Sequence, residues 1–199
     1  MEETRKKDLR VIKTEQLIKD TFIEMVQTIG YQRITIKDLC EKAMINRNTF
    51  YLHYNDKDHL VKMMINEVFT KYNNKLNPMG NQFYTNVLLG QKEQFTINVK
   101  DFLLLIYEDI EMYRMILLDN DLSGYFKTFE TAYEKLILKN VKPKNKRSQL
   151  IFRYILSGIG GVLKDWIIKE TSSIDDTASF ISQLIFEDMK FYVESNNFF

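Results

Sequence analysis

The chain is poor in the residues that cross-link small proteins or interrupt helices. Its 199 residues include one cysteine, two prolines and seven glycines. A single cysteine excludes an intrachain disulfide, and the shortage of proline and glycine favours long helices over sheets. No run of about 18 uncharged apolar residues is present, and no leader with a cleavage site, so we expect neither a membrane span nor secretion. These absences predict a cytoplasmic protein.

Residue patterns that support catalysis or metal binding are also missing. There is no phosphate-binding glycine loop, no zinc-binding HExxH sequence and no paired cysteines. The two histidines, His53 and His59, lie close to each other, and Cys40 has no nearby base on its helix face. We therefore expect no catalytic residue, no metal, no cofactor and no enzymatic activity. Cys40 is most simply a small buried apolar residue.

Apolar residues are plentiful and recur at helical spacing, so the predicted fold class is all-α. They make up 45% of the chain, enough for a sizeable core in one or two domains. One stripe consists of Ile18, Phe22, Met25 and Ile29, and Gly30 ends it. Asn77, Pro78, Gly80 and Asn81 are expected to interrupt the pattern further along. Helices are predicted at 57–76, 82–88, 92–107, 110–118, 122–140, 145–171 and 176–194.

Charge is distributed unevenly, although the formal net charge is only +1. Residues 1–75 carry 14 Lys and Arg against 11 Asp and Glu, a net charge of +3, whereas residues 76–199 carry 14 against 16, a net charge of −2. The N-terminal part is therefore the electropositive end. Near its start lie Arg5, Lys6, Lys7, Arg10 and Lys13, which could neutralise phosphates or enter a DNA minor groove, or simply solubilise the terminus.

The most specific segment, residues 35–57, predicts two short helices joined by a tight turn. Thr35 can cap the first helix, in which Leu39 faces a core. The turn follows at Met44, and Asn46 can cap the second helix. A helix-turn-helix of this kind places its second helix in the major groove of DNA.

The second of these helices is expected to have two different faces. Phe50 and Tyr54 point toward a core, whereas Arg47, Asn48 and Tyr51 lie on the other face. In the major groove an arginine pairs well with guanine and an asparagine with adenine. The polar face is therefore the predicted DNA-binding face.

The string AMINRNTFYLHY at residues 43–54, followed by Asp56, Lys57 and Leu60, resembles the DNA-binding signature of the TetR/AcrR family of bacterial regulators. The resemblance covers roughly the first 65 residues. It implies a three-helix, N-terminal helix-turn-helix domain at 1–56, joined by a long helix to a helical regulatory and dimerisation domain at 57–199. It also implies base contacts by Arg47 and Asn48 and phosphate contacts around them. The predicted DNA-binding residues are Thr35, Asn46, Arg47, Asn48, Thr49, Tyr51, His53 and Lys57.

One position departs from the family pattern. Met44 occupies the turn position that is usually glycine, and a left-handed conformation is disfavoured by about 1 kcal/mol for other residues. The turn is therefore either strained or built on another conformation.

Three glycines, Gly158, Gly160 and Gly161, lie within a helical pattern that continues to Trp166. Each costs roughly 1 kcal/mol relative to alanine, so close approach by another helix or by a ligand is expected. The C-terminal half weakly resembles TetR-like proteins of the Gram-positive dihydroxyacetone-kinase-regulator type. The resemblance implies that the last two helices meet their twins in a four-helix bundle, with an ordinary intrachain core as the alternative. The predicted interface residues are Ile155, Ile159, Val162, Trp166, Phe180, Leu184 and Phe191.

Aromatic side chains are abundant, with 14 Phe, 11 Tyr and one Trp. Their helical spacing suits plain core or the lining of a pocket, which have the same composition. The candidate effector-binding residues are Phe102, Tyr107, Tyr113, Arg114, Phe126, Arg153 and Ser157. The two arginines lie in or beside apolar runs and could pair with an anionic effector or with an internal carboxylate.

Taken together, the sequence predicts a sequence-specific DNA-binding transcriptional regulator. The favoured hypothesis is a homodimeric repressor that binds a palindromic double-stranded DNA operator and is released by a small-molecule effector. The alternative is a TetR-like, protein-binding co-regulator with weak or no operator recognition. No membrane partner is expected.

Overall fold

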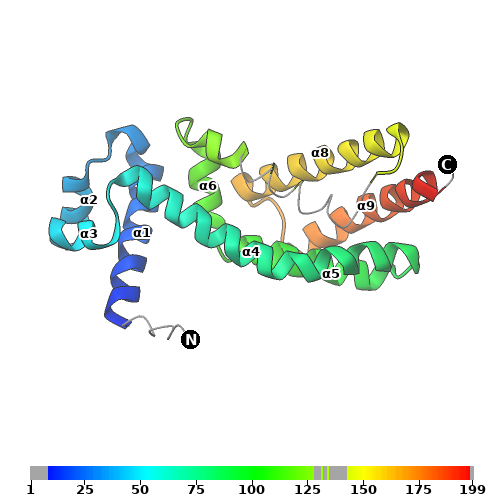
Figure 1. Cartoon of the computed structure of the whole chain (residues 1–199), viewed down its shortest axis with the longest axis horizontal. Helices are drawn as coiled ribbons and strands as arrows, with labels where there is room; N and C mark the ends of the chain where they lie inside the picture. Colours follow the sequence, from blue (N-terminus) through cyan, green and yellow to red (C-terminus); the bar gives the residue numbers. More distant parts are fainter. Residues whose placement is uncertain (1–8, 128–130, 132–133, 135–142, 198–199) are drawn as a thin grey trace.

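A computed structural model describes residues 9–127, 131, 134 and 143–197 (Figure 1). No strand occurs in these ranges, and the predicted all-α fold class is confirmed. The elements are α1 (Leu9–Ile29), the 3-10 helix η1 (Tyr31–Arg33), α2 (Ile36–Lys42), α3 (Arg47–His53), α4 (Lys57–Leu88), α5 (Lys92–Tyr107), α6 (Ile110–Leu118), α8 (Lys146–Lys169) and α9 (Ile174–Asn197). The predicted helix at 122–140 lies mostly outside the described residues, which are helical from Ser123 to Lys127.

The molecule is elongated, with α1, α2 and α3 at one end and α8 and α9 toward the other (Figure 1). We call residues 9–56 the head and residues 57–197 the body. Helix α4 begins at the head and runs along the body, where it packs against α5 and α9. The head is therefore joined to the body by one continuous helix as well as by contacts between α1 and α6.

The head has a small apolar core. Ile18, Phe22 and Met25 of α1 are buried as predicted, with exposed fractions of 0 to 5%. The predicted burial of Ile29 is wrong, because this side chain is the last of α1 and is 41% exposed. Gly30 follows with φ of 82°, a left-handed conformation that glycine adopts without strain, and the chain turns there.

The predicted break after residue 76 is also wrong, because α4 continues without interruption to Leu88. A proline inside a helix removes one backbone hydrogen bond and costs about 3 kcal/mol. Packing offsets this cost here. Tyr72 and Val87 are buried on either side of Pro78, and Phe83 packs against the same core. The segment 82–88 is the end of α4 and not a separate helix.

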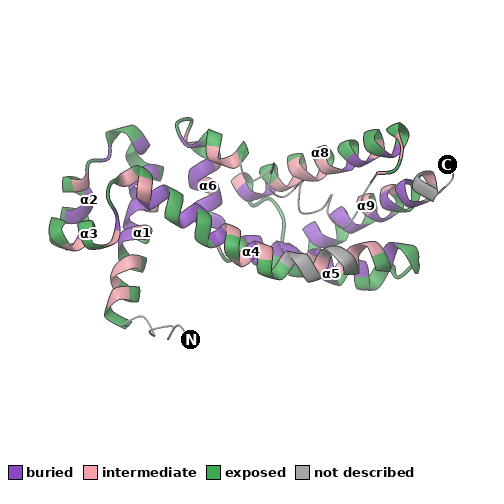
Figure 2. Ribbon diagram, in the orientation of Figure 1, coloured by how far each residue is buried: buried purple, intermediate pink, exposed green. Residues whose placement is uncertain are grey.

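The body helices agree more closely with the sequence pattern. Helices α5 and α6 have the predicted bounds, and α8 and α9 differ from theirs by one to three residues at each end. Asn145 caps α8 by accepting a hydrogen bond from the backbone N–H of Ser148 at 2.8 Å. In the described part of the body, buried side chains line the faces that the helices turn toward one another (Figure 2). Phe95 lies at the centre, with ring centroids 5.3 Å from Phe83 and 5.5 Å from Phe186.

Candidate nucleic-acid interface and body pocket

Local hydrogen bonds set the ends of α2 and α3. The side-chain oxygen of Thr35 accepts from the backbone N–H of Asp38 at 3.2 Å, and that of Asn46 accepts from the backbone N–H of Asn48 at 2.8 Å. Both predicted N-caps are therefore confirmed. These bonds also mean that the side chains of Thr35 and Asn46 are partly occupied before any DNA is present.

The turn between α2 and α3 adopts the left-handed conformation. Met44 has φ of 51°, and its side chain is 92% exposed. Of the two alternatives that the sequence left open, the strained turn is therefore the one observed. The strain costs about 1 kcal/mol, because Cβ of a non-glycine residue crowds the following carbonyl in this conformation.

Helix α3 turns one face to the core and the other to solvent. Phe50 and Tyr54 are buried, as predicted. Arg47, Asn48 and Tyr51 are exposed, and Thr49 is half-buried beside them. The sequence analysis did not include Leu52, which is 82% exposed and lies one turn after Asn48. Its spacing of four residues from Asn48 is the signal that could have identified it.

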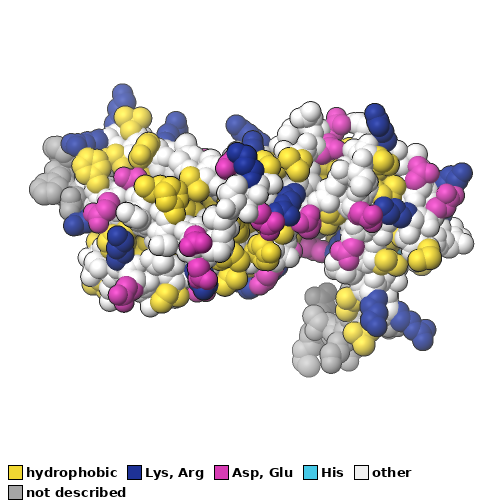
Figure 3. Space-filling view, turned by 180° about the vertical axis from the view of Figure 1, so that it is seen from behind, with side chains coloured by type: hydrophobic (Ala, Val, Ile, Leu, Met, Phe, Trp, Pro, Cys, Tyr) yellow, Lys and Arg dark blue, Asp and Glu magenta, His cyan; other side chains and the backbone are white. Residues whose placement is uncertain are grey.

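Charge is mixed on the face of the molecule that Figure 3 shows. In the view of Figure 3, positive and negative side chains are interspersed over both ends of the molecule. Within the head, Lys42 contacts Glu24 at 2.7 Å and Lys37 contacts Glu41 at 3.9 Å. Three of the basic residues predicted to form an arm, Arg5, Lys6 and Lys7, lie outside the described residues. Arg47 is exposed and places a positive charge at the start of α3.

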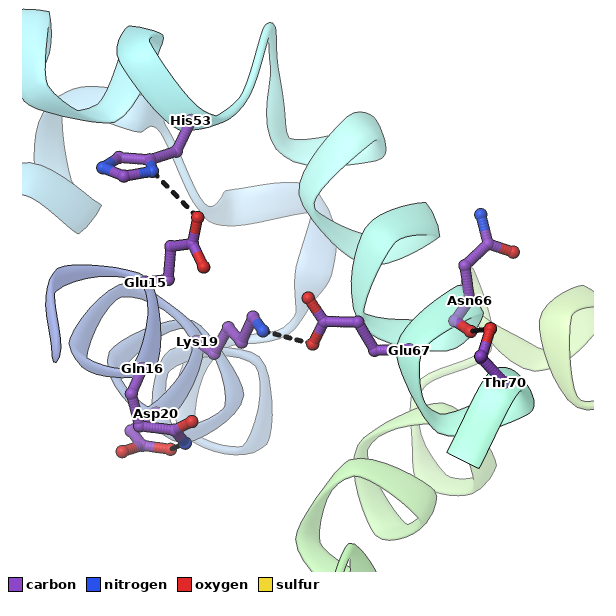
Figure 4. Close-up of polar contacts among 8 residues, drawn as sticks. All are labelled: Glu15, Gln16, Lys19, Asp20, His53, Asn66, Glu67 and Thr70. Atoms are coloured by element: carbon purple, nitrogen blue, oxygen red, sulfur yellow. Dashed lines mark hydrogen bonds and ion pairs between the residues drawn. The ribbon is translucent and has the colours of Figure 1, made fainter. Parts of the chain in front are cut away.

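His53 faces the inside of the head. Its Nδ1 lies 3.1 Å from Oε1 of Glu15 in α1, and the two side chains are only 11% and 16% exposed (Figure 4). One turn further along α1, Lys19 forms an ion pair with Glu67 of α4 (Figure 4). Helix α1 is thus connected to both α3 and α4. The phosphate contact of His53 stays a prediction. In the structure its ring contacts Glu15 and so connects α3 to α1.

Lys57, the first residue of α4, also contacts groups of the head. Its Nζ donates to the backbone carbonyls of Tyr31 at 3.0 Å, Ile34 at 3.3 Å and Gln32 at 3.4 Å, and it lies 4.2 Å from the centre of the Tyr31 ring. An ammonium has three N–H donors, so a phosphate would compete with these carbonyls. Tyr31 also donates to Asp58, and burial together with this carboxylate raises the pKa of Tyr31. Lys57 and Tyr31 thus join η1 to the start of α4.

The body contains a largely apolar pocket of about 280 Å³. Five of the seven predicted effector residues line it, namely Phe102, Tyr113, Phe126, Arg153 and Ser157. The sequence analysis missed Tyr72, which extends the stripe of Leu60, Met64 and Val68 by one more turn of α4. That stripe was the available signal.

Two predicted effector residues do not belong to the lining of this pocket. Tyr107 packs against Trp166, with ring centroids 6.4 Å apart. Arg114 forms ion pairs with Glu111 at 2.5 Å and Glu170 at 2.7 Å, so the internal carboxylates are its partners. Contacts within the chain engage both side chains, and their assignment to an effector site stays a prediction.

The predicted interface residues fall into two groups. Ile155 and Trp166 are buried within the single chain, at 4% and 3% exposed, which favours the intrachain core for them. Ile159 and Val162 are half-buried. On α9, Phe180, Leu184 and Phe191 are 54%, 48% and 47% exposed, and the sequence analysis missed Leu150 and Tyr154 of α8, at 64% and 67%. These five side chains form what we call the α8–α9 apolar face, which remains available to a partner.

The glycines of α8 open onto empty space. A Cβ added at Gly158, Gly160 or Gly161 would meet no atom of the described chain within 4 Å. Gly160 lines the 280 Å³ pocket, whereas Gly158 lines a groove of about 130 Å³ beside Ile159, Val162 and Leu184. The expected close approach to these glycines therefore has no counterpart within the described part of the chain.

The described residues offer neither a metal site nor a membrane span. They contain no group of three or more His, Cys, Asp or Glu side chains placed to hold a metal ion. None of the helices they form is long and apolar enough to cross a membrane.

Comparison with known proteins identifies the N-terminal domain. Residues 20–64 match the family described as bacterial regulatory proteins, tetR family. The chain is 35% identical over 65 residues to the uncharacterized HTH-type transcriptional regulator YxbF of Bacillus subtilis (strain 168), a match that covers 32% of this chain and 17% of that protein. It is 23% identical over 188 residues to DhaS of Lactococcus lactis subsp. lactis (strain IL1403), named an HTH-type dhaKLM operon transcriptional activator, covering 90% of this chain and 92% of that protein.

Solved structures extend the likeness to the whole fold. A TetR-like transcriptional regulator from Rhodococcus sp. RHA1 aligns with a TM-score of 0.61 at 18% identity, covering 86% of this chain and 92% of that one. The dihydroxyacetone kinase operon activator DhaS aligns with a TM-score of 0.57 at 20% identity, covering 90% and 98%. Residues 20–64 therefore match the helix-turn-helix domain of the tetR family, and the chain as a whole shares the fold of these solved structures.

Proposed function

We propose that this TetR-family transcriptional regulator binds a palindromic DNA operator, as a homodimer, through the exposed face of α3. The observation that carries the proposal is the geometry of that helix. Arg47 and Asn48 are exposed at its first turn, while Phe50 and Tyr54 anchor its other face in the core. A guanidinium can bond guanine O6 and N7, and a side-chain amide can bond adenine N6 and N7. Leu52 adds an apolar side chain that suits a thymine methyl group.

The homodimer is proposed from the α8–α9 apolar face. Its five side chains are exposed in the single chain, and the groove at Gly158 lies between the same two helices. Two such helix pairs packed across a two-fold axis would bury these side chains in a four-helix bundle. The two heads would then bind half-sites whose centres lie about 34 to 36 Å apart, or a multiple of that distance.

The 280 Å³ pocket is the proposed effector site. A ligand changes operator affinity only if it binds the two states of the dimer unequally, and DNA and ligand then weaken each other's binding by the same factor. Helix α4 connects the two sites, since it carries Lys57 at the head and Tyr72 at the pocket. We propose that the protein acts in the cytoplasm as a repressor. A dimer bound to an operator that overlaps a promoter would block RNA polymerase from that promoter. A site upstream of the promoter would instead suit an activator, which is what DhaS is named.

The alternative function, a protein-binding co-regulator without strong operator recognition, is favoured by one observation. His53 and Lys57, two of the predicted phosphate contacts, are engaged by groups of the head itself. In that case the α8–α9 apolar face would bind a different protein and not a second copy.

Selection of duplexes from a random pool separates these functions. The wild-type chain should enrich a palindrome, and Arg47→Ala should not, whereas Lys164→Ala, an exposed change on α8, should enrich the same palindrome as wild type. Replacement of its thymines by uracil tests the contact of Leu52 with methyl groups. Failure of the wild-type chain to enrich any sequence would reject the operator-binding proposal in favour of the co-regulator.

A further inference from the structure

Helix α6 connects the head to the body through one shared carboxylate. Glu111, in the first turn of α6, accepts a hydrogen bond from Nε2 of Gln27 in α1 at 2.7 Å. Its other carboxylate oxygen lies 2.5 Å from a terminal nitrogen of Arg114, one turn further along α6. Residues 27 and 111 are 84 positions apart in sequence, so this contact is made by the tertiary fold. A single side chain thus links the head to Arg114.

Arg114 holds the last turn of α8 with its remaining donors. Its Nε donates to the backbone carbonyl of Ile167 at 2.8 Å, and a terminal nitrogen lies 2.7 Å from Glu170. Burial works against the charged guanidinium, but the carboxylates of Glu170 and Glu111 outweigh it and raise the pKa of Arg114. The flat guanidinium can bind three groups at once, because its five N–H donors point in fixed, different directions.

The backbone of Glu170 provides an independent observation. This residue ends α8 with φ of 47° and ψ of 42°, the left-handed conformation in which glycine is the usual residue. Any side chain with a Cβ is disfavoured there. The chain nevertheless has a glutamate at this position, and its carboxylate binds Arg114. The side chain therefore supplies an interaction that glycine could not.

The contacts of Arg114 lie beside the pocket, and α6 also contacts the head at a second point. Tyr113 precedes Arg114 in α6 and lines the pocket, as does Ile167, whose carbonyl Arg114 binds. At the other end of α6, the carboxylate of Asp119 accepts from the backbone N–H of Tyr31 at 2.8 Å. Helix α6 is thus attached to the head at both of its ends and to the pocket wall between them.

We propose that Arg114 is a positioning residue that transmits the position of the last turn of α8 to α1, and thereby sets the orientation of α3 for operator binding. This inference rests on the proposed function and adds a second connection between pocket and head, beside α4. A ligand that displaces Ile167 would shift Arg114, and Glu111 would carry the shift to Gln27.

A double-mutant cycle in operator affinity tests the connection. Gln27→Ala and Glu170→Gln change two exposed residues at opposite ends of the contacts that run through Glu111 and Arg114. If the link carries energy, their effects on operator Kd should deviate from additivity by about threefold or more. The control pairs Gln27→Ala with Lys100→Ala, which breaks a distant ion pair between α5 and α9 and should be additive. Additivity of the first pair within about twofold would overturn the proposal.

Hydrogen exchange on the DNA-free full-length chain gives a second readout. Glu170→Gln, and Arg114→Lys, which keeps the charge but loses the flat fork, should speed amide exchange in residues 22–31 as well as at the end of α8. Lys100→Ala should leave residues 22–31 unchanged. Exchange that increases only in α6 and α8 would reduce Arg114 to a local packing role. This measurement requires no operator, so it tests Arg114 even if the wild-type chain selects no DNA sequence.

Discussion

The head and the body both combine aromatic packing with polar contacts between distant residues, and they differ in what these contacts surround. In the head, polar side chains join helices that are distant in sequence, as Glu15 joins His53 and as Lys57 joins the carbonyl of Tyr31. Hydrogen bonds are directional, so these contacts fix how α3 lies relative to α1 and α4. A small core cannot fix orientation as strongly by apolar area alone.

The body relies on aromatic packing around a pocket. Phe95 lies between Phe83 and Phe186, and Tyr72 meets Phe102 edge-on, with ring centroids 6.4 Å apart. Apolar contacts have little directional preference, and a pocket of about 280 Å³ leaves room for another arrangement. The two regions differ in that the body contacts surround a pocket, which suits a ligand, whereas the head contacts hold α3 with one face exposed. The predictions below test this division, beginning with the largest expected effect.

The largest effect is expected where the body exposes apolar side chains. Leu184→Glu should convert the dimer to monomers at micromolar concentration and abolish operator binding. A leucine buried at an interface contributes about 1.5 to 3 kcal/mol, and the two-fold axis makes the loss count twice. Light scattering gives the mass. The matched control is Leu88→Glu, since Leu88 is 51% exposed against 48% for Leu184 but lies at the end of α4. Equal behaviour of the two variants would mean that the α8–α9 apolar face is not the interface.

A substitution on the exposed face of α3 should weaken DNA binding and leave dimer formation unchanged. Arg47→Ala should leave the dimer intact and weaken binding to the selected operator by about 1 to 3 kcal/mol, because a guanidinium pairing with guanine is lost. Binding to unrelated duplexes should change much less. Gel shifts with both kinds of DNA measure the ratio. Equal losses on the two would show that Arg47 contacts phosphates and not bases.

Features set by local interactions were predictable from the sequence. The caps of α2 and α3 depend on side chains two or three residues from the amides they bind, so Thr35 and Asn46 could be assigned from spacing alone. The bounds of α5 and α6 follow from uninterrupted apolar periodicity. The inward orientation of Phe50, about half a turn from Asn48, follows in the same way.

Features set by tertiary contacts were not predictable. The partner of His53 is 38 residues away, and a carbonyl that binds Lys57 is 26 residues away. Helix α4 passes Pro78 because residues such as Phe83 pack on α5 and α9, which no local pattern shows. Helix α8 is apolar on more than one side, so spacing could not separate buried Ile155 from exposed Tyr154. Pocket lining and core have the same composition, so spacing could not show that Tyr107 packs on Trp166 and does not line the pocket.

Lys57→Ala tests whether a polar contact of the head also serves DNA. The substitution should lower the free energy of unfolding by about 1 to 2 kcal/mol, because the carbonyls of η1 lose a charged donor. If Lys57 also contacts a phosphate, the slope of log K against log salt should fall by about one unit. Lys62→Ala, an exposed change one turn further along α4, is the control. A destabilised variant with an unchanged slope would assign Lys57 a structural role only.

The smallest effect concerns Met44 in the head and Glu170 in the body, the two non-glycine residues in left-handed conformations among those that the structure describes. Met44 in the head has φ of 51° and a side chain 92% exposed, whereas Glu170 in the body has φ of 47° and an ion pair with Arg114. Met44→Gly relieves the backbone strain and loses almost no contact. It should therefore stabilise the chain by up to about 1 kcal/mol, less the extra entropy that glycine gives the unfolded state.

Glu170→Gly relieves the same strain but removes the carboxylate that binds Arg114, so its gain should be smaller or reversed. Chemical denaturation of both variants measures the difference, with unchanged m-values as evidence that the unfolded state is comparable. A larger gain at position 170 than at position 44 would show that the ion pair with Arg114 contributes nothing to stability. The backbone strain would then be similar in the head and in the body, and only the exposure of the two side chains would differ.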